Sequence, residues 1–350
     1  MRLFQLARRA VLLGAGAAVL SLPMLTTSAQ AEDYSADNPL KVALVVHGNL
    51  GDKSFFDSAA AGMAAAEETL PVDVTIIEAG LDRGRWEPAF ADAADSDYDV
   101  VIAGTWEMTG FMSDIAIDYP EKNFIIFDDA PDFSDGANAN ILAIQYRTST
   151  AGYLAGYAAA KLSESGVVST ILGVEAPTVV EFEIGFAQGA RDANPDISIL
   201  RAIAGSFGDP AKGKELALAQ FAQGSDVVFP IAGATGIGAL QAARDEGKLA
   251  VGVDSDQATI FAETDMAQAE AIFTSVEKKI GQSLVIALGQ IIEGSAPMGS
   301  AVLLGLADDA VGISRNKFFD MHVSSELAAE IDAKAAAIEA GEIVVETTMQ

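Results

Sequence analysis

The chain of 350 residues contains no cysteine. This absence excludes disulfides, thiolate catalysis, cysteine-ligated zinc and lipid attachment through cysteine. Histidine is almost as scarce, because His47 and His322 are the two that the sequence contains. No G-x-S-x-G, H-E-x-x-H or Walker A pattern occurs in it either. We therefore expect no catalytic residues, no bound metal and no cofactor.

Basic residues are also few, since 21 Lys and Arg face 50 Asp and Glu and the net charge is −29. Nucleic acids and anionic membrane surfaces both require a basic binding face. The charge balance therefore argues against either partner and indicates a well-solvated acidic surface.

The long apolar run Ala10–Leu20 lies near the N-terminus, directly after Arg8 and Arg9. A small-residue segment, Ser28–Ala31, follows it, and this order is typical of a secretory signal peptide. We expect residues 1–31 to be removed near Ala31 and the mature protein to be a periplasmic monomer. It would be neither a lipoprotein nor otherwise anchored in the membrane, and both the general and the twin-arginine export routes remain open.

Short apolar runs alternate with longer Ala-rich helical patterns, which predicts βαβ units and parallel sheets. Two sets of strands predict an α/β protein with two doubly wound lobes. The expected strands are Val42–Val46, Val74–Glu78, Val100–Ala103, Asn123–Phe127, Ile141–Gln145, Val168–Val174, Ser198–Ile203, Val227–Ile231 and Leu249–Val253.

The boundary between the lobes is expected near Arg147–Thr150. The later segments include an amphipathic helix at Ser275–Gly289, a strand at Ala301–Leu306 and a helix at Ser325–Glu339. We expect an N-terminal lobe of residues 38–147 plus about 258–298. The C-terminal lobe would then hold residues 148–257 plus about 299–350, with a ligand cleft between the two.

The loops that follow the strands combine aromatic and acidic side chains. Ligands of open parallel sheets bind beyond the carboxyl ends of the strands, so these loops are the candidate binding elements. Aromatic faces can flank a planar ligand, and carboxylates accept hydrogen bonds from its hydroxyl or amine groups. The side chains concerned are Phe55, Phe56, Trp106, Phe133, Phe182, Asp52, Asp128, Asp129, Asp254 and Asp256.

Two of these loops resemble cofactor or metal motifs only superficially. The segment "GATGIG" at Gly233–Gly238 has the spacing G-x-x-G-x-G rather than the dinucleotide pattern G-x-G-x-x-G. A tight turn that brings backbone close to a ligand explains it better. The segment "DSDQ" at Asp254–Gln257 lacks the remaining ligands and the glycine of an EF-hand loop.

Seven segments occur in a familiar order: "GDKSF", "AGYLAG", "GFAQGARDANPD", "GDPAKGKELA", "DVVFPIAGATGIGAL", "GVDSDQ" and "FTSVEKK". Together they closely resemble the basic membrane protein (BMP) family of substrate-binding proteins of ABC transporters, over about Lys41–Phe319. The resemblance implies a type I periplasmic-binding fold, with two α/β lobes joined by a three-stranded hinge. It also implies an ABC permease in the inner membrane as the partner.

The resemblance also implies site residues, because well-known members of the family bind purine nucleosides. It assigns stacking on the base to Phe55, and a second aromatic contact to Phe229 or its neighbourhood. It assigns the ribose hydroxyls to Asp254 and to Lys278, which we expect near the start of the helix after "FTS".

The chain departs from the family pattern T-D-x-G-G-x-N-D-K-S-F-N. Val46 stands in the place of the first Asp, with His47 beside it, while Gly51 and Phe56 replace the two Asn. Trp106 stands where the family often has a Gly-x-Gly-Phe loop. The groups that read the base have therefore changed, whereas the pair that holds the sugar is retained.

The sequence thus predicts a receptor that closes its lobes around a nucleoside or related purine. A free base, a sugar or another small polar metabolite remains the alternative ligand, and an exported nucleoside hydrolase remains the alternative class. The predicted ligand-binding residues are His47, Asn49, Asp52, Ser54, Phe55, Trp106, Asp128, Phe182, Phe229, Gly233, Asp254 and Lys278.

Overall fold

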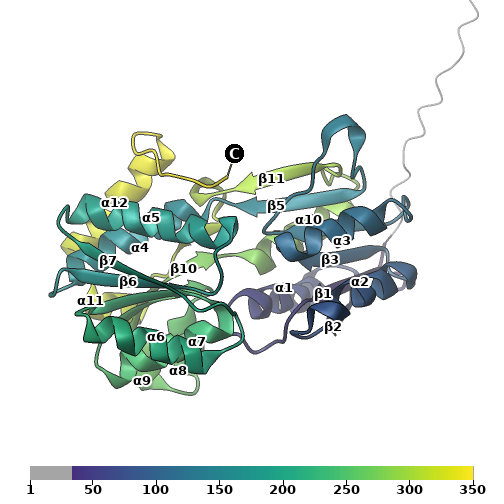
Figure 1. Ribbon diagram of the computed structural model, residues 1–350. Helices are drawn as coiled ribbons and strands as arrows, with labels where there is room; N and C mark the ends of the chain where they lie inside the picture. Colours follow the sequence, from purple (N-terminus) through teal and green to yellow (C-terminus); the bar gives the residue numbers. More distant parts are fainter. Residues whose placement is uncertain (1–33, 350) are drawn as a thin grey trace, which may run out of the picture. The chain divides into compact units, whose positions relative to one another are not determined.

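Two six-stranded sheets organise residues 34–349, the part of the chain that the computed structural model describes. Each sheet forms the centre of one lobe and carries helices on its faces (Figure 1). The predicted fold class of two parallel α/β lobes is confirmed. The predicted signal peptide, residues 1–31, lies outside the described residues.

The first sheet is parallel throughout and has the strand order β11-β5-β4-β3-β1-β2. Its strands are β1 (Leu40–Val46), β2 (Val72–Glu78), β3 (Val100–Gly104), β4 (Asn123–Phe127), β5 (Ile141–Tyr146) and β11 (Ser300–Leu304).

The second sheet has the order β12-β10-β9-β8-β6-β7 and is parallel except for β12, which pairs antiparallel with β10. Its strands are β6 (Val167–Leu172), β7 (Ser198–Ile203), β8 (Val227–Ile231), β9 (Leu249–Asp254), β10 (Ile272–Lys278) and β12 (Val311–Ile313).

Twelve helices and three short 3₁₀ segments connect the described strands. The α-helices are α1 (Phe55–Thr69), α2 (Trp86–Asp95), α3 (Trp106–Ala116), α4 (Thr148–Leu162), α5 (Pro177–Ala193), α6 (Pro210–Ala222), α7 (Gly233–Asp245), α8 (Gln257–Ala262), α9 (Met266–Ala271), α10 (Ile280–Ile292), α11 (Lys317–His322) and α12 (Ser325–Glu339). The 3₁₀ segments are η1 (Arg83–Arg85), η2 (Ser134–Gly136) and η3 (Leu306–Asp308).

The central strands are apolar along their whole length because both of their faces are covered. In β1, Val42 and Leu44 belong to the core that includes residues of α1 and α10. The alternate residues Ala43 and Val45 belong to the core that includes residues of α2 and α3. Because both of its faces are covered in this way, β1 lies in the interior of the lobe.

Helices α4 and α5 approach each other closely on the second sheet, through glycine. A Cβ built on Gly185 would lie 1.9 Å from the carbonyl oxygen of Ser149, and one on Gly189 would lie 1.9 Å from that of Tyr153. No side chain fits at such distances, so glycine is required at both positions. This packing holds α5, whose first turns carry Thr178 and Phe182.

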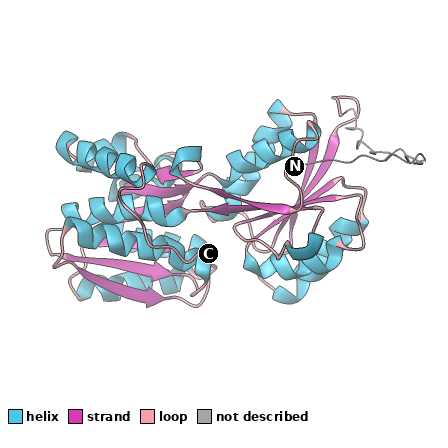
Figure 2. Cartoon of the chain, turned by 90° about the horizontal axis from the view of Figure 1, so that it is seen from above, coloured by secondary structure: helices cyan, strands magenta, loops and turns pink. Residues whose placement is uncertain are grey.

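The chain passes between the sheets three times. The first crossing joins β5 to α4 at Arg147, the second joins β10 to α10 at Lys279, and the third joins β11 to β12 through residues 305–310. The crossings are tied to one another, because Arg147 donates its N–H to Leu304 and Lys279 donates its N–H to Ala310. Figure 2 shows strands running from one lobe toward the other at this hinge.

The last third of the chain differs from the sequence expectation. Residues 272–278 form a strand of the second sheet rather than part of a helix, and helix α10 begins only at Ile280. Residues 300–304 join the first sheet, not the second. The expected lobe boundaries at about 258–298 and 299–350 therefore do not follow the sheets. Pairing with β9 and β12 decides the strand, and such long-range hydrogen bonds override a local amphipathic pattern.

Candidate ligand-binding site

A cavity of about 500 Å³ lies where the carboxyl ends of strands from both sheets meet. The first lobe contributes segments that follow β1, β2, β3 and β4. The second lobe contributes segments that follow β6, β7 and β8, together with the last residues of β9 and β10. This is the position that open parallel sheets offer for a ligand. The volume lies within the range of pockets for small organic molecules.

Lys278 is the polar centre of this cavity and is only 2% exposed. Its Nζ donates a 2.9 Å hydrogen bond to Oδ1 of Asp128 and lies 3.5 Å from Oδ1 of Asp254. Asp254 also accepts a 2.6 Å hydrogen bond from the hydroxyl of Ser54. One buried ammonium thus lies between two buried carboxylates.

These groups come from different lobes. Lys278 and Asp254 end the neighbouring strands β10 and β9 of the second sheet. Asp128 follows β4 of the first sheet, and Ser54 precedes α1 on the same lobe. The pairs Lys278–Asp128 and Ser54–Asp254 therefore join the lobes across the cavity.

Three strand ends at the cavity carry strained backbone. Thr105, Asp128 and Asp254 have φ values of 69°, 67° and 62°, in the left-handed region that non-glycine residues seldom adopt. Each such residue costs on the order of 1–3 kcal/mol and persists only where its surroundings demand it. All three line the cavity, so three of the seven described non-glycine residues with positive φ lie at the site.

Burial changes the acid–base behaviour of two carboxyl groups at the site. Desolvation raises the pKa of Asp128 to about 6, against the opposing effect of the nearby Lys278 ammonium. Desolvation also raises the pKa of Asp52 to about 6, although it accepts backbone hydrogen bonds from Phe56, Asp57 and Ser54. Those three N–H groups belong to the start of α1, so Asp52 fixes the position of the helix that begins with Phe55.

Aromatic rings surround the buried ammonium. The Nζ of Lys278 lies 4.7 Å from the centroid of the Phe55 ring and 5.0 Å from that of Phe182. Phe55 comes from the first lobe and Phe182 from α5 of the second. The polar centre is thus bordered by two apolar ring surfaces, one from each lobe.

A second polar group forms the wall contributed by β1 and β3. Nε2 of His47 lies 3.2 Å from the hydroxyl of Thr105 and 3.5 Å from Oε2 of Glu107. The imidazole makes edge contacts with Phe56 and Trp86, at centroid distances of 5.0 Å and 5.1 Å. Within residues 34–349 its Nδ1 has no hydrogen-bond partner.

The model of a family described as "ABC transporter substrate-binding protein PnrA-like" matches residues 40–348. The chain belongs to this family. The family resemblance predicted from the sequence is confirmed, and this PnrA-like protein is a substrate-binding protein of the ABC transporter type, not an enzyme.

Curated relatives and solved structures agree with this assignment. Basic membrane protein A of Borreliella burgdorferi is 29% identical over 309 residues, which cover 87% of each chain. An ABC transporter solute-binding protein from Aeropyrum pernix K1 matches with a TM-score of 0.78 and 22% identity, covering 88% of this chain and 94% of its own. One from Conexibacter woesei matches with a TM-score of 0.70 and 23% identity, covering 89% and 100%.

The structure brings most of the predicted site residues of this PnrA-like protein together. Ten of the twelve line the cavity, and Ser54 and Phe229 do not. Phe229 is fully buried and packs against Phe182 and Phe186. Ser54 is buried behind Asp254, whose carboxylate it holds. The ten that line it are His47, Asn49, Asp52, Phe55, Trp106, Asp128, Phe182, Gly233, Asp254 and Lys278.

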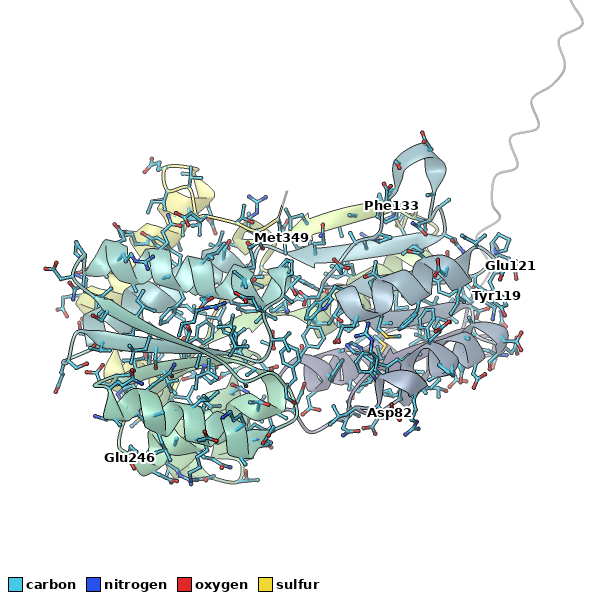
Figure 3. The ribbon with its side chains drawn as sticks, in the orientation of Figure 1. Asp82, Tyr119, Glu121, Phe133, Glu246 and Met349 are labelled. Atoms are coloured by element: carbon cyan, nitrogen blue, oxygen red, sulfur yellow. The ribbon has the colours of Figure 1, made fainter. Side chains whose placement is uncertain are left out.

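The secondary-structure position expected for Lys278 is wrong, since it ends a strand and does not begin a helix. Phe133, one of the loop aromatics, is absent from the cavity lining, and it lies in a loop between β4 and β5 that projects from the first lobe (Figure 3). The lining residues that were not among the predicted site residues include Glu107, Thr178 and Phe207. Glu107 directly follows Trp106 at the start of a helix, and that neighbour was the available signal.

Residues 34–349 lack two kinds of feature. Within that range, no helix is long and apolar enough to cross a membrane. Nor do three or more His, Asp or Glu side chains converge there in a way that could hold a metal ion.

Proposed function

We propose that this protein captures a purine nucleoside or a closely related planar, hydroxylated ligand and presents it to an ABC permease. The carrying observation is the buried Lys278 between Asp128 and Asp254, with the rings of Phe55 and Phe182 beside it. Carboxylates and an ammonium suit a diol, which both donates and accepts hydrogen bonds. The rings suit a flat apolar partner.

Closure of the lobes would supply the binding mechanism. The contacts Lys278–Asp128 and Ser54–Asp254 join the lobes in the closed arrangement. A ligand that touches both lobes makes more contacts in that arrangement than in an open one, where it can contact only one lobe, so it shifts the population toward closure. The permease would then distinguish the closed receptor from the open one.

The other predicted residues are assigned supporting roles in this proposal. Trp106 would border the ligand plane, and Asn49 would offer a hydrogen bond at the cavity mouth. The backbone near Gly233, whose φ is 53°, would allow close approach of the ligand to the start of α7. Asp52 would act indirectly by positioning Phe55.

We also propose that the protein works as a periplasmic monomer after removal of residues 1–31. The family assignment and the apolar leader support export, and the absence of cysteine supports release without a lipid anchor. Edman sequencing of the protein isolated from the periplasm would give the mature N-terminus, and light scattering would give the oligomeric state.

Native mass spectrometry of the protein as purified tests the ligand class directly. A mass increase equal to a purine nucleoside would support the proposal, and a mass increase equal to a hexose or pentose would contradict it. A sugar is the second candidate, because the acidic groups around Lys278 would also suit a polyol. Calorimetry with inosine, adenosine, guanosine, adenine and ribose would then rank the classes.

A further inference from the structure

Glu107 is a carboxylate of the cavity wall that the ribose-binding arrangement above does not use. It is the second residue of α3, and its side chain is 21% exposed. One oxygen, Oε1, lies 3.3 Å from the guanidinium of Arg83, whose own side chain is 66% exposed. The other oxygen, Oε2, lies 3.5 Å from His47 Nε2, which is beyond a normal hydrogen bond.

The carboxylate therefore retains unused acceptor capacity. An ionised carboxylate can accept about four hydrogen bonds, and the contacts above use at most a part of them. The guanidinium of Arg83 contacts only one of the two oxygens of Glu107. Glu107 can thus accept hydrogen bonds from a ligand.

The strand order places Glu107 at a defined separation from the polar centre. Asp128 follows β4, Glu107 belongs to the segment after β3, and His47 follows β1; these three strands are adjacent in the order β4-β3-β1. Neighbouring strands lie about 4.8 Å apart. Strand spacing therefore puts the backbone positions that carry Glu107 and His47 about 5–10 Å from the position that carries Asp128. That span corresponds to the length of a nucleoside from its sugar to the far edge of its base.

We propose that Glu107 determines base specificity by accepting hydrogen bonds from two N–H groups of the ligand. This arrangement favours a guanine base over other purines. This inference rests on the proposed function, because it assumes that the sugar occupies the Lys278 end. Guanine presents two adjacent donors, N1–H and the 2-amino group, which match the two oxygens of a carboxylate. Hypoxanthine offers N1–H alone. Adenine presents an unprotonated N1, which a carboxylate repels.

The expected order of affinity is therefore guanosine, then inosine, then adenosine. Loss of one hydrogen bond to a charged acceptor reduces affinity on the order of 10- to 100-fold. A binding site that hydrogen-bonds a particular ligand group binds analogues without that group weakly, because the polar side chain of the site is then left unpaired.

Calorimetry of wild type and Glu107→Gln with guanosine, inosine and adenosine tests this assignment. The carboxamide of Gln presents one donor and one acceptor, which is the arrangement that complements adenine. In Glu107→Gln we expect guanosine to bind about 10- to 100-fold more weakly and adenosine to bind as well as or better than before. Glu87→Gln removes the same charge from an exposed position on α2 and should leave all three affinities unchanged.

The outcomes separate this inference from the proposed function. If wild type binds none of the three nucleosides, the proposed function fails and the assignment of Glu107 fails with it. If the nucleosides bind but Glu107→Gln weakens all three equally, or leaves the guanosine-to-adenosine ratio unchanged, only the assignment of Glu107 is overturned. A ratio that shifts toward adenosine supports it, since a merely structural role would not change the ranking.

Discussion

The ammonium of Lys278 lies 2.9 Å from Oδ1 of Asp128, although the two residues are 150 positions apart and belong to different sheets. Both side chains are almost completely buried, so the pair is sheltered from the solvent that weakens exposed ion pairs. Breaking such a pair by removing one partner leaves an uncompensated buried charge. The pair therefore joins the two lobes through groups that line the cavity.

Asp254→Asn should abolish discrimination between a nucleoside and its 2′-deoxy form. If the ribose diol donates to Asp254, wild type should bind the deoxy form about 10- to 100-fold more weakly, because a charge-assisted hydrogen bond is lost. In the variant the two forms should bind alike, as calorimetry would measure.

Asp256→Asn is the matched control for this substitution. Asp256 lies two residues further along, caps α8 and accepts from Asn316, and it does not line the cavity. The Asp256→Asn variant should still bind the nucleoside more tightly than its 2′-deoxy form. Equal binding of ribose and deoxyribose forms by wild type would show that the diol is not the contact.

Phe55→Ala should weaken nucleoside binding by roughly 5- to 150-fold, because stacking of one base on an aromatic ring is worth about 1–3 kcal/mol. Phe55 is only half-buried and forms part of the cavity wall, so we expect the free energy of unfolding to change little. Fluorescence titration and thermal melting would measure the two effects separately.

The comparison for Phe55 is Phe229, which is fully buried in the core of the second lobe. Phe229→Ala should lower the free energy of unfolding by about 3–5 kcal/mol. The opposite pattern, with Phe55→Ala strongly destabilised and its affinity unchanged, would place Phe55 in the core instead of the site.

Ligand affinity should fall as the solution is acidified. Burial raises the pKa of Asp128 to about 6, so this carboxyl is mainly ionised above that pH and mainly protonated below it. Its ionised fraction falls about tenfold between roughly pH 7.5 and pH 5. If the ligand donates to the ionised form, its affinity should decrease by up to the same factor, which calorimetry across this range would detect.

Three variants identify the titrating group. Asp128→Asn cannot ionise there and should give a flatter profile, whereas His47→Gln tests the imidazole that lines the same cavity. Asp52→Asn is the third comparison, because the pKa of Asp52 is also raised to about 6 and this group would titrate over the same range. An affinity that is constant or rises on acidification would rule out a carboxylate acceptor at Asp128.

Deletion of residues 344–350 should destabilise the second lobe. Glu181 of α5 is fully buried, and its carboxylate accepts hydrogen bonds from the Thr347 hydroxyl at 2.8 Å and from the Thr348 N–H at 2.6 Å and hydroxyl at 2.8 Å. Removing these donors leaves a charged group without its partners, which costs about 1–3 kcal/mol or more. Chemical denaturation would measure the loss.

Glu181→Gln in the shortened chain provides the control for that deletion. A neutral amide is less costly to leave unpaired than a carboxylate, so the double change should be more stable than the deletion alone. Equal stability of the full and shortened chains would show that the C-terminal segment contributes nothing through Glu181.

Local patterns in the sequence were sufficient for much of this description. Buried parallel strands such as Asn123–Phe127 and Val227–Ile231 are largely apolar runs, and both have the predicted bounds. The edge strand Ser198–Ile203 also has its predicted bounds. The helix at Ser325–Glu339 also agrees. The family followed from seven short motifs in order, and the rule that ligands bind at strand carboxyl ends directed attention to the correct loops.

The tertiary structure decided what depends on residues distant in the chain. Residues 272–278 became a strand because β9 and β12 pair with them, and no local pattern encodes those partners. Phe229 faces the core because α5 covers that side of β8, and Ser54 lies behind Asp254 because two lobes meet there. Glu107 reaches the cavity because β3 lies between β1 and β4. The sequence by itself determined most of the elements and the family, since these depend on short-range spacing; side-chain contacts across the sheets depend on how the whole chain packs.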